Sequence, residues 1–249
     1  MPESTAAGGS PEETELRAAI DGLYLAFADR PLRSWTDPCL DCCATEEQER
    51  ALHAVPLREL SKEALGPYVS SGSTWGDERD FAHLLPRVFE IVSFDDFDWP
   101  VVTLLVGRAG ESGLADWPSA EVEAVDRWTR AWWRQTLAMD SPVHPPVDVL
   151  CAIARAIGDV TAHLADWIAD DRPPASRHLV RLVLEEWVPA TRELDDVWWE
   201  DVDRGAHVGR WIATPPVVER LRRIADATEH AGDPIAAEAT LAWQVASRA

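Results

Sequence analysis

Basic residues are scarce in this chain: 23 Lys and Arg stand against 44 Asp and Glu, which leaves a formal net charge of −21 over 249 residues. Because phosphate contacts dominate nucleic-acid affinity and would be repulsive here, this charge counts against direct nucleic-acid binding. No apolar run approaches the ~18 residues that a membrane span needs. The start, Met1-Pro2-Glu3-Ser4, lacks the basic and apolar regions of a secretory signal. We therefore expect an acidic cytoplasmic protein that acts away from membranes and nucleic acids.

The common catalytic signatures are also missing. Gly107-Arg108-Ala109-Gly110 has neither a preceding strand nor a lysine, so it fails as a phosphate-binding loop. The sequence contains no His-Glu-x-x-His metal pair and no Gly-x-Ser-x-Gly nucleophile elbow. These absences exclude the usual cofactor and hydrolase motifs, and they favour a protein that binds over one that catalyses.

Hydrophobic residues are plentiful. They make up 46% of the chain and include 13 Trp, a composition that excludes disorder along the whole chain. Residues 1–9 are small and polar and predict a disordered tail. Order begins at Ser10-Pro11-Glu12-Glu13, a capping box with proline at the first helical position. Amphipathic segments separated by prolines then predict about nine or ten helices. Among them we expect one long helix from Pro146 to about Ala169, and we expect Asp195 to Gly209 to be irregular.

These segments predict an all-α fold. Without a fixed period or a repeated motif, the architecture is either an irregular multi-helix bundle or an α-solenoid-like array. We expect a single domain over residues 10–249, with residues 140–146 as the candidate point of sub-division. Only Val101–Val106 is strand-like. Its β-branched residues favour a strand, whereas Pro100 fits a helix start and no partner strand is evident.

A cysteine cluster lies in the loop after the first helix. Its members are Cys39, Cys42 and Cys43. The Cys-x-x-Cys spacing lets two thiolates reach one tetrahedral Zn²⁺, with His53, or else His83, as a further ligand. The same spacing suits a reactive thiol pair, because the capping box Thr45-Glu46-Glu47-Gln48 starts a helix whose dipole favours thiolate. Reduced thiols that only pack are the third alternative, so the cofactor prediction is none or one Zn.

A polar stripe occupies one face of the helix expected from about Asp77. At spacings of three and four residues it carries Asp80, His83, Arg87 and Glu90. Acid, imidazole and guanidinium on one face could orient a substrate anion or transfer protons, which makes these residues the catalytic candidates. The alternative, which we favour, is that these residues form ion pairs on the outer, polar face of an amphipathic helix.

A resemblance appears at this stripe. The segment Thr74-Trp75-Gly76-Asp77, followed by Asp80-Phe81, His83 and Leu85-Pro86-Arg87, is similar to one in an uncharacterised, mostly actinobacterial family of helical proteins. The likeness extends through Leu57-Arg58-Glu59-Leu60 and, more loosely, to most of the chain. The resemblance implies a proline-punctuated helical fold with a cysteine cluster ahead of the motif, and it implies no activity.

The pair Trp198-Trp199 suggests a contact surface. Adjacent residues cannot both face one core from a helix, so we expect one indole at the surface. The acidic residues around the pair include Asp195, Asp196 and Asp201. An exposed indole among carboxylates suits a basic partner protein. We therefore predict a protein-interaction module, such as an inhibitor, an immunity-like or antitoxin-like protein, or a scaffold. The alternative is a zinc-dependent or thiol-based enzyme that uses the cysteine cluster.

Overall fold

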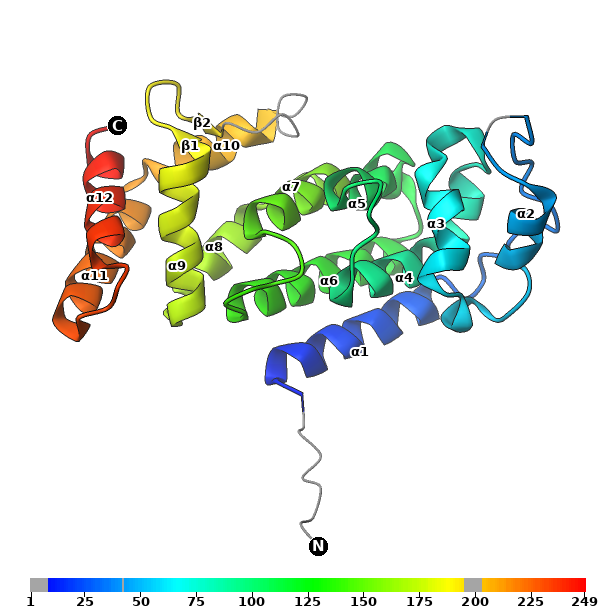
Figure 1. Cartoon of the computed structure of the whole chain (residues 1–249), viewed down its shortest axis with the longest axis horizontal. Helices are drawn as coiled ribbons and strands as arrows, with labels where there is room; N and C mark the ends of the chain where they lie inside the picture. The colour runs from blue at the N-terminus through cyan, green and yellow to red at the C-terminus, as the bar shows by residue number, and fades with distance from the viewer. Residues whose placement is uncertain (1–8, 42, 195–202) are drawn as a thin grey trace, which may run out of the picture. The chain divides into compact units, whose positions relative to one another are not determined.

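The computed structural model of the chain describes residues 9–41, 43–194 and 203–249 (Figure 1). Helix accounts for 69% of the residues, and the described part contains twelve α-helices and one two-stranded sheet. The all-α prediction is confirmed, whereas the expected count of nine or ten helices is wrong.

Two stretches explain the higher count. The helix expected from Pro146 to Ala169 is divided, because Gly158 has a φ of 90° and ends the first half at Ile157. Side chains disfavour this backbone conformation, so the glycine permits the break. The second addition is a helix over Asp203–Ile212, which begins inside a stretch expected to be irregular.

The ambiguous run at Val101 is helical. Val101 is the N-cap residue of the helix Val102–Glu111, whose apolar residues Leu105 and Val106 are buried. The alternative in which Pro100 precedes a helix start is therefore the correct one.

The chain divides into two compact units, Met1–Gln135 and Thr136–Ala249. None of the helices in residues 9–41, 43–194 and 203–249 combines the length and apolar character that crossing a membrane requires.

The first unit contains five whole helices and most of a sixth (Figure 1). These are α1 (Pro11–Ala26), α2 (Glu46–Leu52), α3 (Lys62–Ser70), α4 (Glu78–Phe94), α5 (Val102–Glu111) and α6 (Ser119–Ala138). Three 3-10 turns join them: η1 (Leu57–Glu59), η2 (Gly72–Thr74) and η3 (Leu114–Asp116).

Helix α4 is the central element of this unit and contacts α1, α5 and η1. Its apolar face is the one that the sequence predicts, and it is at most 1% exposed at Phe81, Leu84, Leu85, Val88 and Val92. Burying such a face supplies most of the stability of an amphipathic helix. The core of the unit is therefore organised around α4.

Tryptophans on α6 complete this core. Trp128 stacks on Phe89 with ring centroids 4.1 Å apart and on Trp132 at 4.8 Å. The Trp128 indole N–H donates to Ser93 Oγ at 3.0 Å, which satisfies its one polar group. The helical tryptophans thus pack in the core, as their spacing predicts.

The second unit contains six further helices and the sheet. The helices are α7 (Pro146–Ile157), α8 (Thr161–Ala169), α9 (Pro173–Arg181), α10 (Asp203–Ile212), α11 (Pro215–Ala231) and α12 (Ala236–Ser247). A π-helical turn, η4 (Leu182–Glu186), leads from α9 into β1 (Trp187–Val188), which pairs antiparallel with β2 (Glu193–Leu194). Helices α11 and α12 pack along each other.

Candidate functional site

The C-terminal end of the polar stripe fastens α4 to its neighbours. Arg87 Nε donates to the carbonyl oxygen of Leu60 at 2.7 Å, and Arg87 Nη1 donates to Glu90 Oε2 at 2.7 Å. The hydroxyl of Tyr24 on α1 donates to the same Glu90 oxygen at 2.6 Å. Burial, and then Glu90, raise the pKa of Tyr24 above its ordinary value, so the phenol stays a hydrogen-bond donor.

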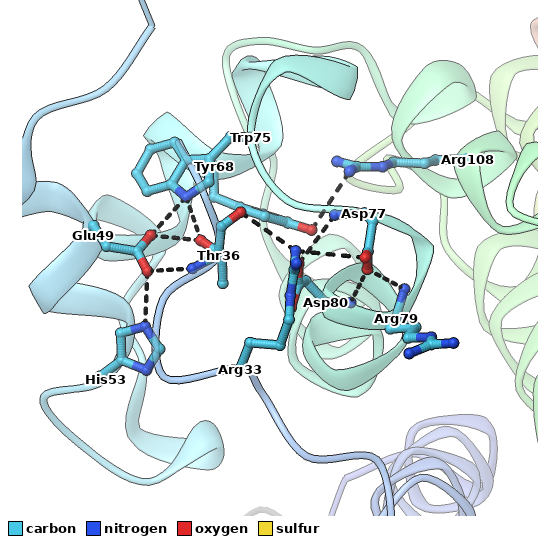
Figure 2. A network of polar contacts seen from close by, with 10 residues as sticks. All are labelled: Arg33, Thr36, Glu49, His53, Tyr68, Trp75, Asp77, Arg79, Asp80 and Arg108. Carbon is cyan, nitrogen blue, oxygen red and sulfur yellow. Dashed lines mark hydrogen bonds and ion pairs between the residues drawn. The ribbon is translucent and has the colours of Figure 1, made fainter. Parts of the chain in front are cut away.

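The N-terminal end of the stripe holds the loop that follows α1. His83 Nδ1 is in hydrogen-bond contact with the carbonyl oxygen of Arg30. Asp80 is fully buried, and it accepts hydrogen bonds from the Arg33 guanidinium, with Nε 3.0 Å from Oδ1 (Figure 2). Asp80 Oδ2 also accepts from the N–H of Asp77 at 3.0 Å, and Asp77 caps the start of α4 in return.

The stripe therefore consists of contacts that connect α4 with other segments of the first unit, which fits the ion-pair interpretation. A catalytic role for its four members stays a prediction. They are Asp80, His83, Arg87 and Glu90.

A second buried carboxylate lies close by. Glu49, on α2, is 1% exposed and accepts from the N–H of Thr36 at 2.8 Å and from the indole N–H of Trp75 at 2.8 Å (Figure 2). The Thr36 hydroxyl and His53 Nε2, the latter 3.0 Å away, contact it as well. Burial alone would raise the pKa of Glu49, but the hydrogen bonds from Thr36, His53 and Trp75 outweigh it and lower the pKa. Glu49 is thus a buried, charged side chain that binds Thr36, His53 and Trp75 inside the first unit.

The predicted metal site is described only in part. Cys42 lies outside the described residues, and His53 is bound to Glu49. Cys39 and Cys43 are half-buried, and the backbone N–H of Cys39 donates to the carbonyl oxygen of Thr74 at 3.2 Å. No group of three or more His, Cys, Asp or Glu in the described part of the chain is arranged to hold a metal. The zinc site stays a prediction, which metal analysis of the purified protein and of Cys42→Ser would test.

A pocket of about 530 Å³ opens beside the network in the first unit, and Gly76 and Asp77 of the motif form part of its wall. Gly76 has a φ of 76°, and a Cβ there would lie 3.0 Å from Asp80 Oδ2 and 3.2 Å from Tyr68 Cε2. Only glycine combines this backbone with so close an approach. The Thr-Trp-Gly-Asp motif therefore builds both the buried network and one wall of the pocket.

Arg108, on α5, also lines the pocket, and its guanidinium lies against aromatic rings. Its guanidinium carbon is 4.7 Å from the centroid of the Phe81 ring and 5.1 Å from that of Tyr68. Its Nη2 donates to the Tyr68 hydroxyl at 3.4 Å, a contact drawn as a dashed line in Figure 2. Burial raises the pKa of Tyr68 to about 12, so the phenol is neutral at pH 7. Stacking of this kind fixes the direction of a guanidinium.

Trp99 provides the exposed aromatic surface of the pocket. It is 55% exposed, although Phe97 two residues earlier is buried. The Ser70 hydroxyl donates to the carbonyl oxygen of Trp99 at 2.9 Å. Lys62, the single lysine, bonds to Asp95 Oδ1 at 3.0 Å and fastens the start of the same loop. The indole is therefore presented by an anchored loop.

Sequence reasoning missed Trp99 and selected other tryptophans. Trp198 and Trp199, and with them Asp195, Asp196 and Asp201, lie outside the described residues, so their predicted contact with a basic partner stays a prediction. The segment Asp95-Asp96-Phe97-Asp98-Trp99, which follows α4, carries the same signal, an indole among acidic residues. The signal was present there, but position in the loop alone does not tell which aromatic is buried.

Comparisons of the chain with protein-family models, with curated proteins and with solved structures found no match. The resemblance to an actinobacterial helical family therefore stays a prediction, and a functional interpretation must come from the geometry of the site.

Proposed function

We propose that this chain is an acidic binding module and that the pocket beside Trp99 receives a basic side chain of a partner protein. One observation carries the proposal: a half-exposed indole and three carboxylates surround the same pocket. Trp99 supplies the indole, and the carboxylates are Asp77, Glu78 and Glu111.

The pocket suits both parts of a lysine or arginine side chain. The aliphatic stem would lie against the apolar lining, which includes Val69, Leu104 and Leu105. The cationic head would meet the carboxylates and the face of the Trp99 indole. Arg108 also lines the pocket; its guanidinium lies over the Phe81 and Tyr68 rings, and its buried Nη1 has no hydrogen-bond acceptor among the described residues. The remaining charges of the lining are negative.

The charge of the whole chain supports the same class of partner. A net charge of −21 attracts basic surfaces and raises the rate of association with them at low salt. Glu78 is exposed and forms no ion pair with any residue that the structure describes, so its charge is available to a partner. Rim charges of this kind act mainly on association and are screened by salt.

We expect Trp99→Ala to weaken the binding of a fluorescently labelled arginine-rich peptide by about tenfold, because the indole face and its desolvation are lost. Fluorescence anisotropy titrations at several salt concentrations measure this effect. Glu78→Gln should lower the affinity less, and mainly at low salt.

Matched controls separate the pocket from the general acidity of the chain. Trp35 is 41% exposed and lies outside the pocket, so Trp35→Ala should bind the peptide like the unchanged protein. Glu123, exposed on α6, provides the control Glu123→Gln, which removes one charge elsewhere. Equal effects of the two tryptophan variants, or of the two glutamine variants, would contradict a role for this pocket.

A further inference from the structure

The second unit contains a smaller pocket, of about 210 Å³, whose lining comes from α9, α11 and the turn before α12. Its lining includes two carboxylates, Asp171 and Asp233, and also, in a strongly acidic chain, three arginines. They are Arg177, Arg220 and Arg223. The arrangement of these three cations carries the inference.

Arg220 is a buried arginine, with a side chain only 7% exposed. Its Nη1 lies 2.8 Å from Asp171 Oδ1, and its Nη2 donates to Ser176 Oγ at 2.9 Å and to the carbonyl oxygen of Asp170 at 2.8 Å. Its Nε is buried and finds no hydrogen-bond acceptor among the described residues. Burying a donor without an acceptor is costly, so this atom indicates an unmet requirement for an oxygen.

Arg223 lies three residues further on the same helix and lines the same pocket. Arg177 is paired with Asp140 and Arg220 with Asp171, whereas Arg223 forms no ion pair with any described residue. Like charges three residues apart on a helix repel each other. Burial lowers the pKa of Arg220, Asp171 raises it, and the proximity of Arg223 lowers it again. Arg223 therefore keeps its guanidinium outside the ion pairs of the described residues, although it lies close enough to Glu219 to help lower the pKa of that carboxyl.

We propose that this pocket binds a small molecule through an oxyanion group, a phosphate or a carboxylate, held between Arg220 and Arg223. Guanidinium groups suit such anions because their N–H groups match pairs of oxygens. The apolar part of the lining, which includes Ile224 and Ile235, leaves room for a short hydrocarbon portion. This site is in a different unit from the Trp99 pocket and does not depend on its function.

Thermal unfolding in inorganic phosphate, in acetate and in chloride at matched ionic strength tests the proposal. A ligand that binds only the folded state raises the melting temperature with concentration. We expect phosphate or acetate to stabilise the protein more than chloride does, and the more effective of the two identifies the group. In Arg223→Gln, about tenfold more of that anion should be needed for the same shift.

The neighbouring Arg222 supplies a matched control, because it is exposed on the same helix, pairs with Glu219 and Asp226, and does not line the pocket. Arg222→Gln should respond to the anion like the unchanged protein. The proposal is overturned if neither anion stabilises the protein beyond chloride, or if Arg223→Gln and Arg222→Gln respond equally.

Discussion

Replacing Trp75 by alanine is expected to lower the free energy of unfolding by about 4 kcal/mol, the typical cost of removing a large aromatic side chain from a core. Trp75 is fully buried, and its ring meets Tyr68 edge to face with centroids 5.8 Å apart. Its indole N–H donates to Thr36 Oγ1 at 2.7 Å and to Glu49 Oε2 at 2.8 Å. The substitution therefore leaves both a cavity and a buried carboxylate that has lost a donor.

Urea denaturation followed by far-ultraviolet circular dichroism measures this effect without relying on tryptophan emission. Trp75→Phe should fall between Trp75→Ala and the unchanged protein, because it keeps one aromatic ring but loses the N–H donor and part of the indole volume, at a cost of about 1–3 kcal/mol. The matched control is Trp99→Ala, expected to change stability by less than about 0.5 kcal/mol because the indole is largely exposed. If Trp75→Ala is no more destabilising than Trp99→Ala, the buried network does not support the unit as described.

Replacing Glu49 by glutamine is expected to lower the free energy of unfolding at pH 7 by about 2–3 kcal/mol. The carboxylate accepts hydrogen bonds through both oxygens, from Thr36, Trp75 and His53. A glutamine amide offers one accepting oxygen and turns an NH₂ group toward the remaining donors. At least one buried donor is then left without an acceptor.

The pH dependence of stability provides a second test of Glu49. Its pKa is lower in the folded protein than the ordinary value of about 4.5. The unfolded chain therefore binds the proton more readily, and the stability that Glu49 contributes is fully present above the ordinary value. It is lost as the pH falls through the lower, folded-state pKa. Denaturation curves between neutral pH and pH about 3 should accordingly show a steeper acid loss in the unchanged protein than in Glu49→Gln.

Glu47→Gln is the control for both measurements, because Glu47 is exposed on the same helix. It should leave stability at pH 7 within about 0.5 kcal/mol and keep the acid loss of the unchanged protein. An acid loss that is as steep in Glu49→Gln as in Glu47→Gln would show that the buried carboxylate is not the group responsible.

Local sequence signals predicted much of the fold because helix starts and apolar faces are local features. Ser10 accepts the hydrogen bond from the N–H of Glu13, and the capping box at Thr45 and Gln48 forms as its sequence indicates. Pro67 shows where a local signal misleads: proline disfavours a helix interior, yet α3 continues from Lys62 to Ser70 through it. There, packing of buried residues such as Tyr68 outweighs the missing backbone donor.

The candidate site was predictable only in part, because its connections are distant in sequence. The motif around Trp75 and Asp80 stood out from spacing and residue types. Its partners did not: Arg33 lies 47 residues from Asp80, and Thr36 lies 39 residues from Trp75. No local pattern specifies such pairs, since they depend on how the loop after α1 crosses the fold. The same holds for Arg220, whose burial follows from the packing of α11 against α8 and α9.

The most direct test of the proposed binding module is a nuclear magnetic resonance titration of the indole N–H groups with the arginine-rich peptide. Each of the 13 tryptophans has one indole N–H, and Trp75→Phe and Trp99→Phe assign the two signals that matter. We expect the Trp99 signal to shift as peptide is added and to stop shifting at high salt, while the Trp75 signal stays in place. A Trp99 signal that does not move while the peptide binds, or equal shifts at Trp75 and Trp99, would contradict the proposal.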